Sequence, residues 1–154
     1  MTIKYHGRNL RQGRVSLSNQ IYLVTAVTAE RKAIFSEFIA GRALVNELLV
    51  SETRGRATTL AYVVMPDHLH WLLSLGAGNT LTDVVGNVKR YSATAINKIL
   101  DRAALPLWQR GFHDHALRHE EDIQHIARYI VANPLRAGLV RRVGDYPLWD
   151  AIWL

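Results

Sequence analysis

Two histidines separated by a single residue are the feature of this sequence with the clearest chemical potential. His68 and His70 flank Leu69 in the stretch HLHWLLSL, whose composition predicts a β-strand over residues 68–75. Because side chains alternate between the faces of a strand, both imidazoles would point to the same side. Two neutral imidazoles on one face supply half of a metal site. Two solvent-facing histidines would give the same pattern, so these residues alone leave both interpretations open.

A tyrosine and an asparagine further along the chain form a second pair. Residues 119–133 show the apolar periodicity of an amphipathic helix, and Tyr129 and Asn133 fall one helical turn apart on the flank of its apolar stripe. Tyrosine can attack a phosphorus centre covalently, and an amide oxygen can bind a hard cation. Alternatively, Tyr129 is a boundary aromatic residue and Asn133 ends the helix.

The composition restricts the classes of protein to which the chain can belong. Its 154 residues, 49% hydrophobic and 21% charged, suit one globular domain. The absence of cysteine excludes a disulfide scaffold, a thiol nucleophile and a Cys-ligated zinc or iron–sulfur site. No apolar run reaches the roughly 18 residues of a membrane span, so we expect a soluble cytoplasmic protein with no membrane partner.

The positive charge gathers in three separate blocks. The chain has 19 Lys and Arg against 13 Asp and Glu, and basic residues concentrate in residues 1–14, 89–110 and 128–142. Such blocks on a small domain favour a polyanionic partner, nucleic acid first, although a merely soluble basic surface has the same composition. The candidate DNA-binding residues are Arg8, Arg11, Arg14, Lys89, Arg90, Arg118 and Arg136.

The pattern of elements predicts an α+β fold. Strands are expected at residues 20–29, 58–65, 68–75 and 108–117, and helices at 34–52, from Thr80 or Thr82 to about 100, and at 119–133. This order is close to β-α-β-β-α-β, a ferredoxin- or RRM-like antiparallel sheet with helices on one face. We divide the chain into a basic N-terminal arm (1–18), a single domain (19–142) and a C-terminal tail packed on that domain (143–154).

Several motifs taken together resemble those of a known family. The segment VVMPDHLHWLL resembles the histidine–hydrophobic–histidine (HUH) motif of single-strand tyrosine transposases. The segments LWQRGFHDHALR and ARYIVANPLRAGLV resemble those of the subgroup associated with repeated extragenic palindromes, the REP-associated tyrosine transposases. The resemblance runs from about residue 20 to residue 149. It implies an HUH endonuclease-like fold, with Tyr129 as nucleophile and His68, His70 and Asn133 as metal ligands.

The resemblance also implies an activity. We expect a sequence-specific transposase that cleaves and rejoins single-stranded DNA, at hairpin elements, through a 5′-phosphotyrosine and with Mg²⁺ or Mn²⁺. A monomer is favoured over a homodimer. Two alternatives are a non-catalytic single-strand nucleic-acid-binding module of the RRM type and a metal-dependent phosphodiesterase using activated water. Tyr91 is the rival nucleophile, and the roles of Tyr91 and His115 stay open at this point.

Overall fold

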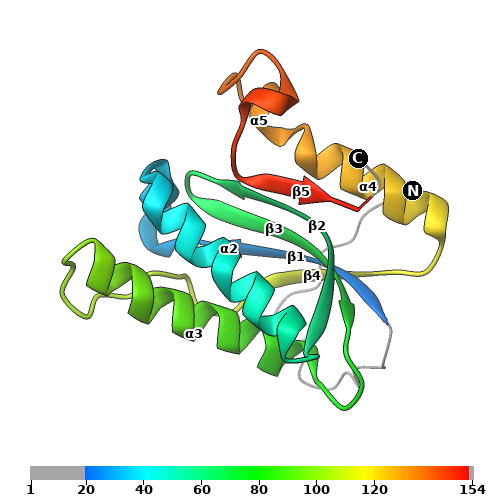
Figure 1. Ribbon diagram of the computed structural model, residues 1–154, viewed down its shortest axis with the longest axis horizontal. Coiled ribbons are helices and arrows are strands. Elements are labelled where there is room, and N and C mark those ends of the chain that lie inside the picture. The colour runs from blue at the N-terminus through cyan, green and yellow to red at the C-terminus, as the bar shows by residue number, and fades with distance from the viewer. Residues whose placement is uncertain (1–19, 153–154) are drawn as a thin grey trace.

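The computed structural model describes residues 20–152, which form a five-stranded antiparallel sheet with helices packed against it (Figure 1). The order of strands across the sheet is β4-β1-β3-β2-β5. The strands are β1 (Ile21–Val27), β2 (Ala57–Met65), β3 (His68–Leu75), β4 (His113–Leu117) and β5 (Trp149–Ala151). The predicted arm, with Arg8, Arg11 and Arg14, lies outside the described residues.

Three long helices and one short helix accompany the sheet. They are α2 (Phe38–Thr53), α3 (Leu81–Ile99), α4 (Glu120–Val131) and the single turn α5 (Asn133–Arg136). Of the two threonines predicted as possible caps of α3, Thr80 is the N-cap, because its hydroxyl accepts a hydrogen bond from the backbone N–H of Asp83. Within residues 20–152, no helix is both long and apolar enough to cross a membrane.

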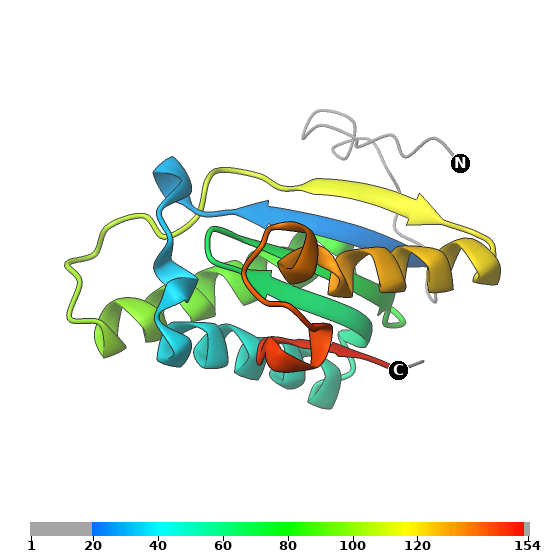
Figure 2. The ribbon, with the colours of Figure 1, turned by 90° about the horizontal axis from the view of Figure 1, so that it is seen from above.

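The predicted α+β fold with an antiparallel sheet is confirmed, but the helices cover both faces of the sheet. α2 and α3 pack against the face that carries Tyr22 and Trp71. α4 packs against the opposite face, over Leu23 and Leu72. Seen from above, α4 lies in front of the strands (Figure 2). The physical reason lies in the continuous apolar runs of β1 and β3: a strand that is apolar on both sides requires cover on both faces.

A tight turn joins β2 to β3 and fixes where the first histidine lies. Met65 pairs directly with His68, so only Pro66 and Asp67 form the connection. The backbone N–H groups of Phe35 and Thr28 donate to the carbonyl oxygens of Pro66 and Asp67, respectively, at 3.0 and 2.9 Å. The start of β3 is therefore held from two directions.

The chain differs from the predicted elements in two places near its C-terminus. The segment assigned to a packed tail contributes β5, which pairs with β2 at the sheet edge and is only three residues long. The helix predicted over 119–133 is interrupted at Ala132, so Tyr129 belongs to α4 and Asn133 begins α5. Pro134 explains the break: it has no N–H to donate to the carbonyl oxygen of Ile130 one turn earlier, and it disfavours helical geometry in the residue before it.

Candidate active site

His68 and His70 lie side by side on the face of β3 that α4 covers. Leu69, between them, points into the opposite core, under α2 and α3. The two imidazole rings meet edge to face, with their centroids 4.8 Å apart and their planes at 79°. The structure thus brings together the two side chains that the strand alternation predicted to share a face.

Asp67 fixes the orientation of the first imidazole. Its Oδ1 lies 2.7 Å from Nδ1 of His68, and its Oδ2 accepts a hydrogen bond from Nε of Arg31 at 3.2 Å. Burial acts to raise the pKa of Asp67, but the hydrogen bond and charge of His68 and the charge of Arg31 outweigh it and lower that pKa. An ionised carboxylate only accepts, so Nδ1 of His68 donates, and in the uncharged form of this ring Nε2 keeps its lone pair.

Arg31 reaches Asp67 from an uncommon backbone conformation. Glu30 and Arg31 both have positive φ angles, 56° and 52°, in the short 3₁₀ turn η1 (Ala29–Arg31). Residues other than glycine adopt this left-handed region at a cost of order 1–3 kcal/mol each, and such strain gathers at functional sites. The turn is tied to the site by the hydroxyl of Thr28, which donates to the carbonyl oxygen of Lys32 at 2.8 Å.

Thr25 of β1 plays the corresponding part for the second imidazole. Its Oγ1 lies 2.8 Å from Nδ1 of His70, its cross-strand neighbour. Burial, and then the charges of His68 and Arg136, lower the pKa of His70 from the usual 6.5 to about 3. The ring is therefore neutral at physiological pH, and in the tautomer whose Nδ1–H donates to the threonine oxygen, Nε2 carries the lone pair that can bind a cation.

A hollow of about 390 Å³ opens beside the two rings. Its walls come from β1, β3, β4 and the η1 turn, and they comprise Thr25, Val27, Arg31, His68, His70 and His113. His113 faces this space because it pairs with Thr25 across the sheet. The volume lies within the range of about 300–1,000 Å³ that is usual for ligand sites.

Arg136 contacts both Tyr129 and Asn133. Its guanidinium carbon lies 3.8 Å from the centroid of the Tyr129 ring, and Tyr129 is 53% exposed. Its Nη2 donates to the carbonyl oxygen of Tyr129 at 2.6 Å and to Oδ1 of Asn133 at 3.0 Å. The charge of the same side chain contributes to the low pKa of His70. One guanidinium thus contacts both residues of the C-terminal pair.

The donor atoms present suit a divalent cation with mixed nitrogen and oxygen ligands. The part of the chain that the structure describes holds no cluster of three or more His, Cys, Asp or Glu side chains able to bind a metal. A site on the two Nε2 atoms therefore needs a different third donor, and the amide oxygen of Asn133 is the candidate that the sequence singled out. Two imidazole nitrogens and an amide oxygen form a mixed donor set that could hold a divalent cation, and of the two predicted ions Mn²⁺ matches imidazole better than Mg²⁺ does.

The other predicted residues are more dispersed. Tyr91 belongs to α3, on the face of the sheet opposite the histidines, which removes it as rival nucleophile. Lys89 directs its ammonium group to the carbonyl oxygens of Gln109 and Gly111, at 2.8 and 2.6 Å, and so holds a loop.

The remaining candidates are two exposed arginines, Arg90 and Arg118, and His115 on β4. Arg90 is exposed and donates to Oδ1 of Asn87, and Arg118 is exposed just after β4. His115 lies on β4, opposite Leu23 of β1, so it faces the same side of the sheet as His70. Contact of any of these residues with DNA stays a prediction.

Four further residues of the site were not among the predicted ones: Thr25, Arg31, Asp67 and His113. Asp67 is the one that the sequence could have revealed, because it directly precedes His68 in a two-residue turn. Thr25 and His113 reach the site through the register of neighbouring strands, and Arg31 reaches it through a left-handed turn. None of these three positions has a signal in the local pattern.

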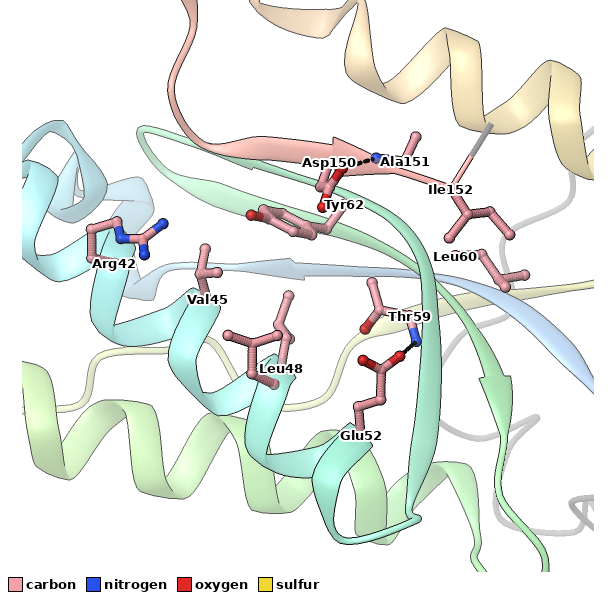
Figure 3. Close-up of a pocket in the computed structure, with 11 residues that line it drawn as sticks. Arg42, Val45, Leu48, Glu52, Thr59, Leu60, Tyr62, Asp150, Ala151 and Ile152 are labelled. Atoms are coloured by element: carbon pink, nitrogen blue, oxygen red, sulfur yellow. Dashed lines mark hydrogen bonds between the residues drawn. The ribbon is translucent and has the colours of Figure 1, made fainter. Parts of the chain in front are cut away.

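A second cavity, of about 370 Å³, lies on the other side of the sheet between α2, β2 and β5 (Figure 3). Tyr62, Arg42 and Asp150 give it a polar lining, and burial, followed by the charge of Asp150, raises the pKa of Tyr62. None of the predicted catalytic or metal-binding residues lines this cavity, so the candidate site is the hollow at the histidines.

Comparison with known families gives an independent result. The model of the family described as transposase IS200-like matches residues 16–133. A REP-associated tyrosine transposase of Escherichia coli (strain K12) is 31% identical over 88 residues, which cover 56% of this chain and 50% of that protein. A putative REP-associated tyrosine transposase of Haemophilus influenzae (strain Rd) is 28% identical over 101 residues, 58% of this chain and 56% of that protein. The chain spans about half the length of the curated relatives it matches.

Solved structures show the same fold. A REP-associated tyrosine transposase bound to a REP hairpin superposes with a TM-score of 0.73 at 22% identity, covering 88% of this chain and 79% of that one. A putative transposase from Deinococcus radiodurans superposes with a TM-score of 0.55 at 22% identity, covering 77% and 93% of the two chains.

The buried state of His70 leads to a prediction that NMR can check. In metal-free folded protein, the His70 ring should stay uncharged from pH 8 to about pH 4.5, because its pKa is near 3, whereas in urea the same ring should titrate near 6.5. Since the unfolded chain binds this proton first, His70 makes folding less favourable as the pH falls from about 6.5 toward 3. A ring that titrates near 6.5 in the folded protein would contradict this burial.

Proposed function

The chain belongs to the family of IS200-like transposases, and from this premise we propose that it cleaves and rejoins single-stranded DNA at hairpin elements through a covalent bond to Tyr129. The observation that carries the proposal is the pair of imidazoles in one hollow, each with Nδ1 engaged and Nε2 left for a ligand. The hairpin substrate is supported by the solved REP-associated tyrosine transposase that is bound to a REP hairpin.

The proposed reaction conserves phosphodiester bonds. The Oη of Tyr129 attacks the phosphorus and loses its proton to solvent, the bond from phosphorus to the 3′-oxygen breaks, and that oxygen takes up a proton as a free 3′-hydroxyl. The fragment 3′ of the break stays on the tyrosine through its 5′-phosphate, as a phosphodiester. In the reverse direction another 3′-hydroxyl attacks, and Tyr129 regains its proton. Because one ester replaces another, no external energy source is needed.

The side chains around the scissile phosphate each have a defined part. A Mg²⁺ or Mn²⁺ ion, held by Nε2 of His68, Nε2 of His70 and Oδ1 of Asn133, would supply charge neutralisation at a nonbridging phosphate oxygen. Asp67 and Thr25 keep the two imidazoles in the required tautomers. Arg136 holds the Tyr129 ring beneath its guanidinium and orients the Asn133 amide.

The structure also bears on the RRM-like alternative. A module of that kind binds bases on an open face of its sheet. Here α2 and α3 cover one face, and α4 covers much of the other. The open part of the second face is the hollow that contains the histidines, which favours a site for one phosphate over a platform for stacked bases.

The nucleophile can be tested by removing one oxygen. Tyr129→Phe keeps the ring and its contact with Arg136, so stability should change by no more than about 1 kcal/mol and DNA affinity should survive. Cleavage should be lost. Wild-type protein incubated with a hairpin oligonucleotide labelled 3′ of the break should give a denaturation-resistant band, and peptide mapping should place the label on Tyr129.

Tyr91→Phe is the matched control, since it makes the same change on the opposite side of the sheet and should leave the adduct intact. Adduct formation by Tyr129→Phe would refute the assignment. Cleavage with no adduct would favour the phosphodiesterase with activated water, and binding with no cleavage would favour the non-catalytic module.

The metal site can be tested by titration calorimetry with Mn²⁺, independently of activity. Asp67→Asn removes the negative charge beside the His68 ring and should weaken Mn²⁺ binding by about 10–100-fold. His68→Ala or His70→Ala should weaken it further, and Asn133→Ala less than either histidine change, because a neutral amide is the weakest ligand. EDTA should abolish cleavage reversibly. Asp145→Asn, at an exposed ion pair, is the control. Equal affinity in all variants would rule out a site on these residues.

Because Arg136 is proposed to position Tyr129 and Asn133, replacing it should change the cleavage rate and the DNA affinity to different extents. Arg136→Ala should lower single-turnover cleavage by more than it lowers DNA affinity, since it frees both Tyr129 and Asn133. Arg136→Lys should restore affinity but not the full rate, because an ammonium cannot make the planar contacts of a guanidinium. Arg128→Ala, which removes an exposed cation from the preceding helix α4, serves as control. Complete rescue by lysine would reduce Arg136 to a source of charge.

A further inference from the structure

A second hollow continues the one at the histidines. It has a volume of about 170 Å³ and is lined by Thr25, Val27, Gln109, Arg110, Gly111, Phe112 and His113. Thr25, Val27 and His113 also line the first hollow, so the two form one groove that runs from β3 across β1 and β4 to residues 109–112. Pockets that bind a whole small molecule usually measure about 300–1,000 Å³. The smaller hollow lies below this range, so it suits one part of a larger ligand.

The loop that closes this groove is held at several points. The N–H of Gln109 donates to the carbonyl oxygen of Val27 at 2.9 Å, which extends the pairing of β1 beyond the strand. Lys89 reaches across from α3 and donates to the carbonyl oxygens of Gln109 and Gly111. Gly111 has a φ of 71°, a conformation that favours glycine. A loop fixed before binding loses little freedom when a ligand arrives.

The polar side chains of the loop are available for a ligand. Gln109 and Arg110 are both exposed, and neither side chain has a hydrogen-bond or ion-pair partner within residues 20–152. An amide can donate to and accept from a base edge at the same time, and a guanidinium binds phosphate in a bidentate manner. No carboxylate lines either hollow, so the groove suits an anionic chain.

We propose that the smaller hollow binds the nucleotide next to the scissile phosphate, with Gln109 contacting its base and Arg110 its phosphate. This inference rests on the proposed function, because it places the scissile phosphate at His68 and His70. It adds a source of sequence preference that lies outside the hairpin itself. The preference belongs to one flanking, single-stranded position, since the hollow has room for only part of a chain.

The experiment measures DNA binding by a protein that cannot cleave. Hairpin oligonucleotides with randomised stems and randomised single-stranded flanks are selected with the Tyr129→Phe protein. Gln109→Ala and Arg110→Ala are then made in that background and compared by fluorescence anisotropy. Arg54→Ala is the matched control, because it removes an exposed cation at the end of α2, on the other side of the sheet.

We expect Arg110→Ala to weaken binding by roughly tenfold, because it removes a charge-assisted contact with a phosphate. Gln109→Ala should remove the base preference at one flanking position and leave the others. Both effects should disappear when that flank is trimmed away, and Arg54→Ala should retain the wild-type pattern.

Two results would overturn the subsite: unchanged affinity and base preference in both variants, or a loss that stays the same after the flank is removed, which would indicate general electrostatic attraction. Failure of the proposed function is a separate result, because it shows as the absence of a Tyr129 adduct in wild-type protein while the binding comparison remains measurable.

Discussion

The candidate site depends on the position of β3 at the centre of the sheet. A central strand is hydrogen-bonded on both sides, so its register is fixed by β1 and β2 together. A shift by one residue would move Trp71 and Leu73 out of one core and Leu72 out of the other. The apolar residues of β3 therefore hold His68 and His70 on the face that α4 covers.

Burial then determines the chemistry of these histidines. In a site that disfavours charge, His70 is neutral, and its Nδ1 is engaged by Thr25. His68 obtains its orientation from Asp67, whose own charge is favoured by Arg31. One arginine, Arg31, and no carboxylate are among the residues that line the hollow, a composition compatible with an anionic ligand. These features support the proposal of a phosphate bound beside a cation at the two histidines.

The break between α4 and α5 sets the relative position of Tyr129 and Asn133, the two residues proposed to complete the site. In a continuous helix, Tyr129 and Asn133 would stack one turn apart, and their mutual position would be set by the helix alone. Pro134 interrupts that geometry. Arg136 instead donates hydrogen bonds to the carbonyl oxygen of Tyr129 and to the amide oxygen of Asn133. The pair is consequently positioned by a side chain that the structure also links electrostatically to His70.

The sequence by itself determined the order of elements, the shared face of His68 and His70 and the resemblance that singled out Tyr129 and Asn133, because these depend on local periodicity and on motifs. Only the tertiary structure decided that helices cover both faces, that residues 149–151 form an edge strand and that Asn133 lies beyond a helix break. It alone brought Thr25, Arg31 and His113 to the histidines. Contacts between residues more than 30 positions apart arise from strand register and packing, and no local pattern of residue types encodes which of them will meet.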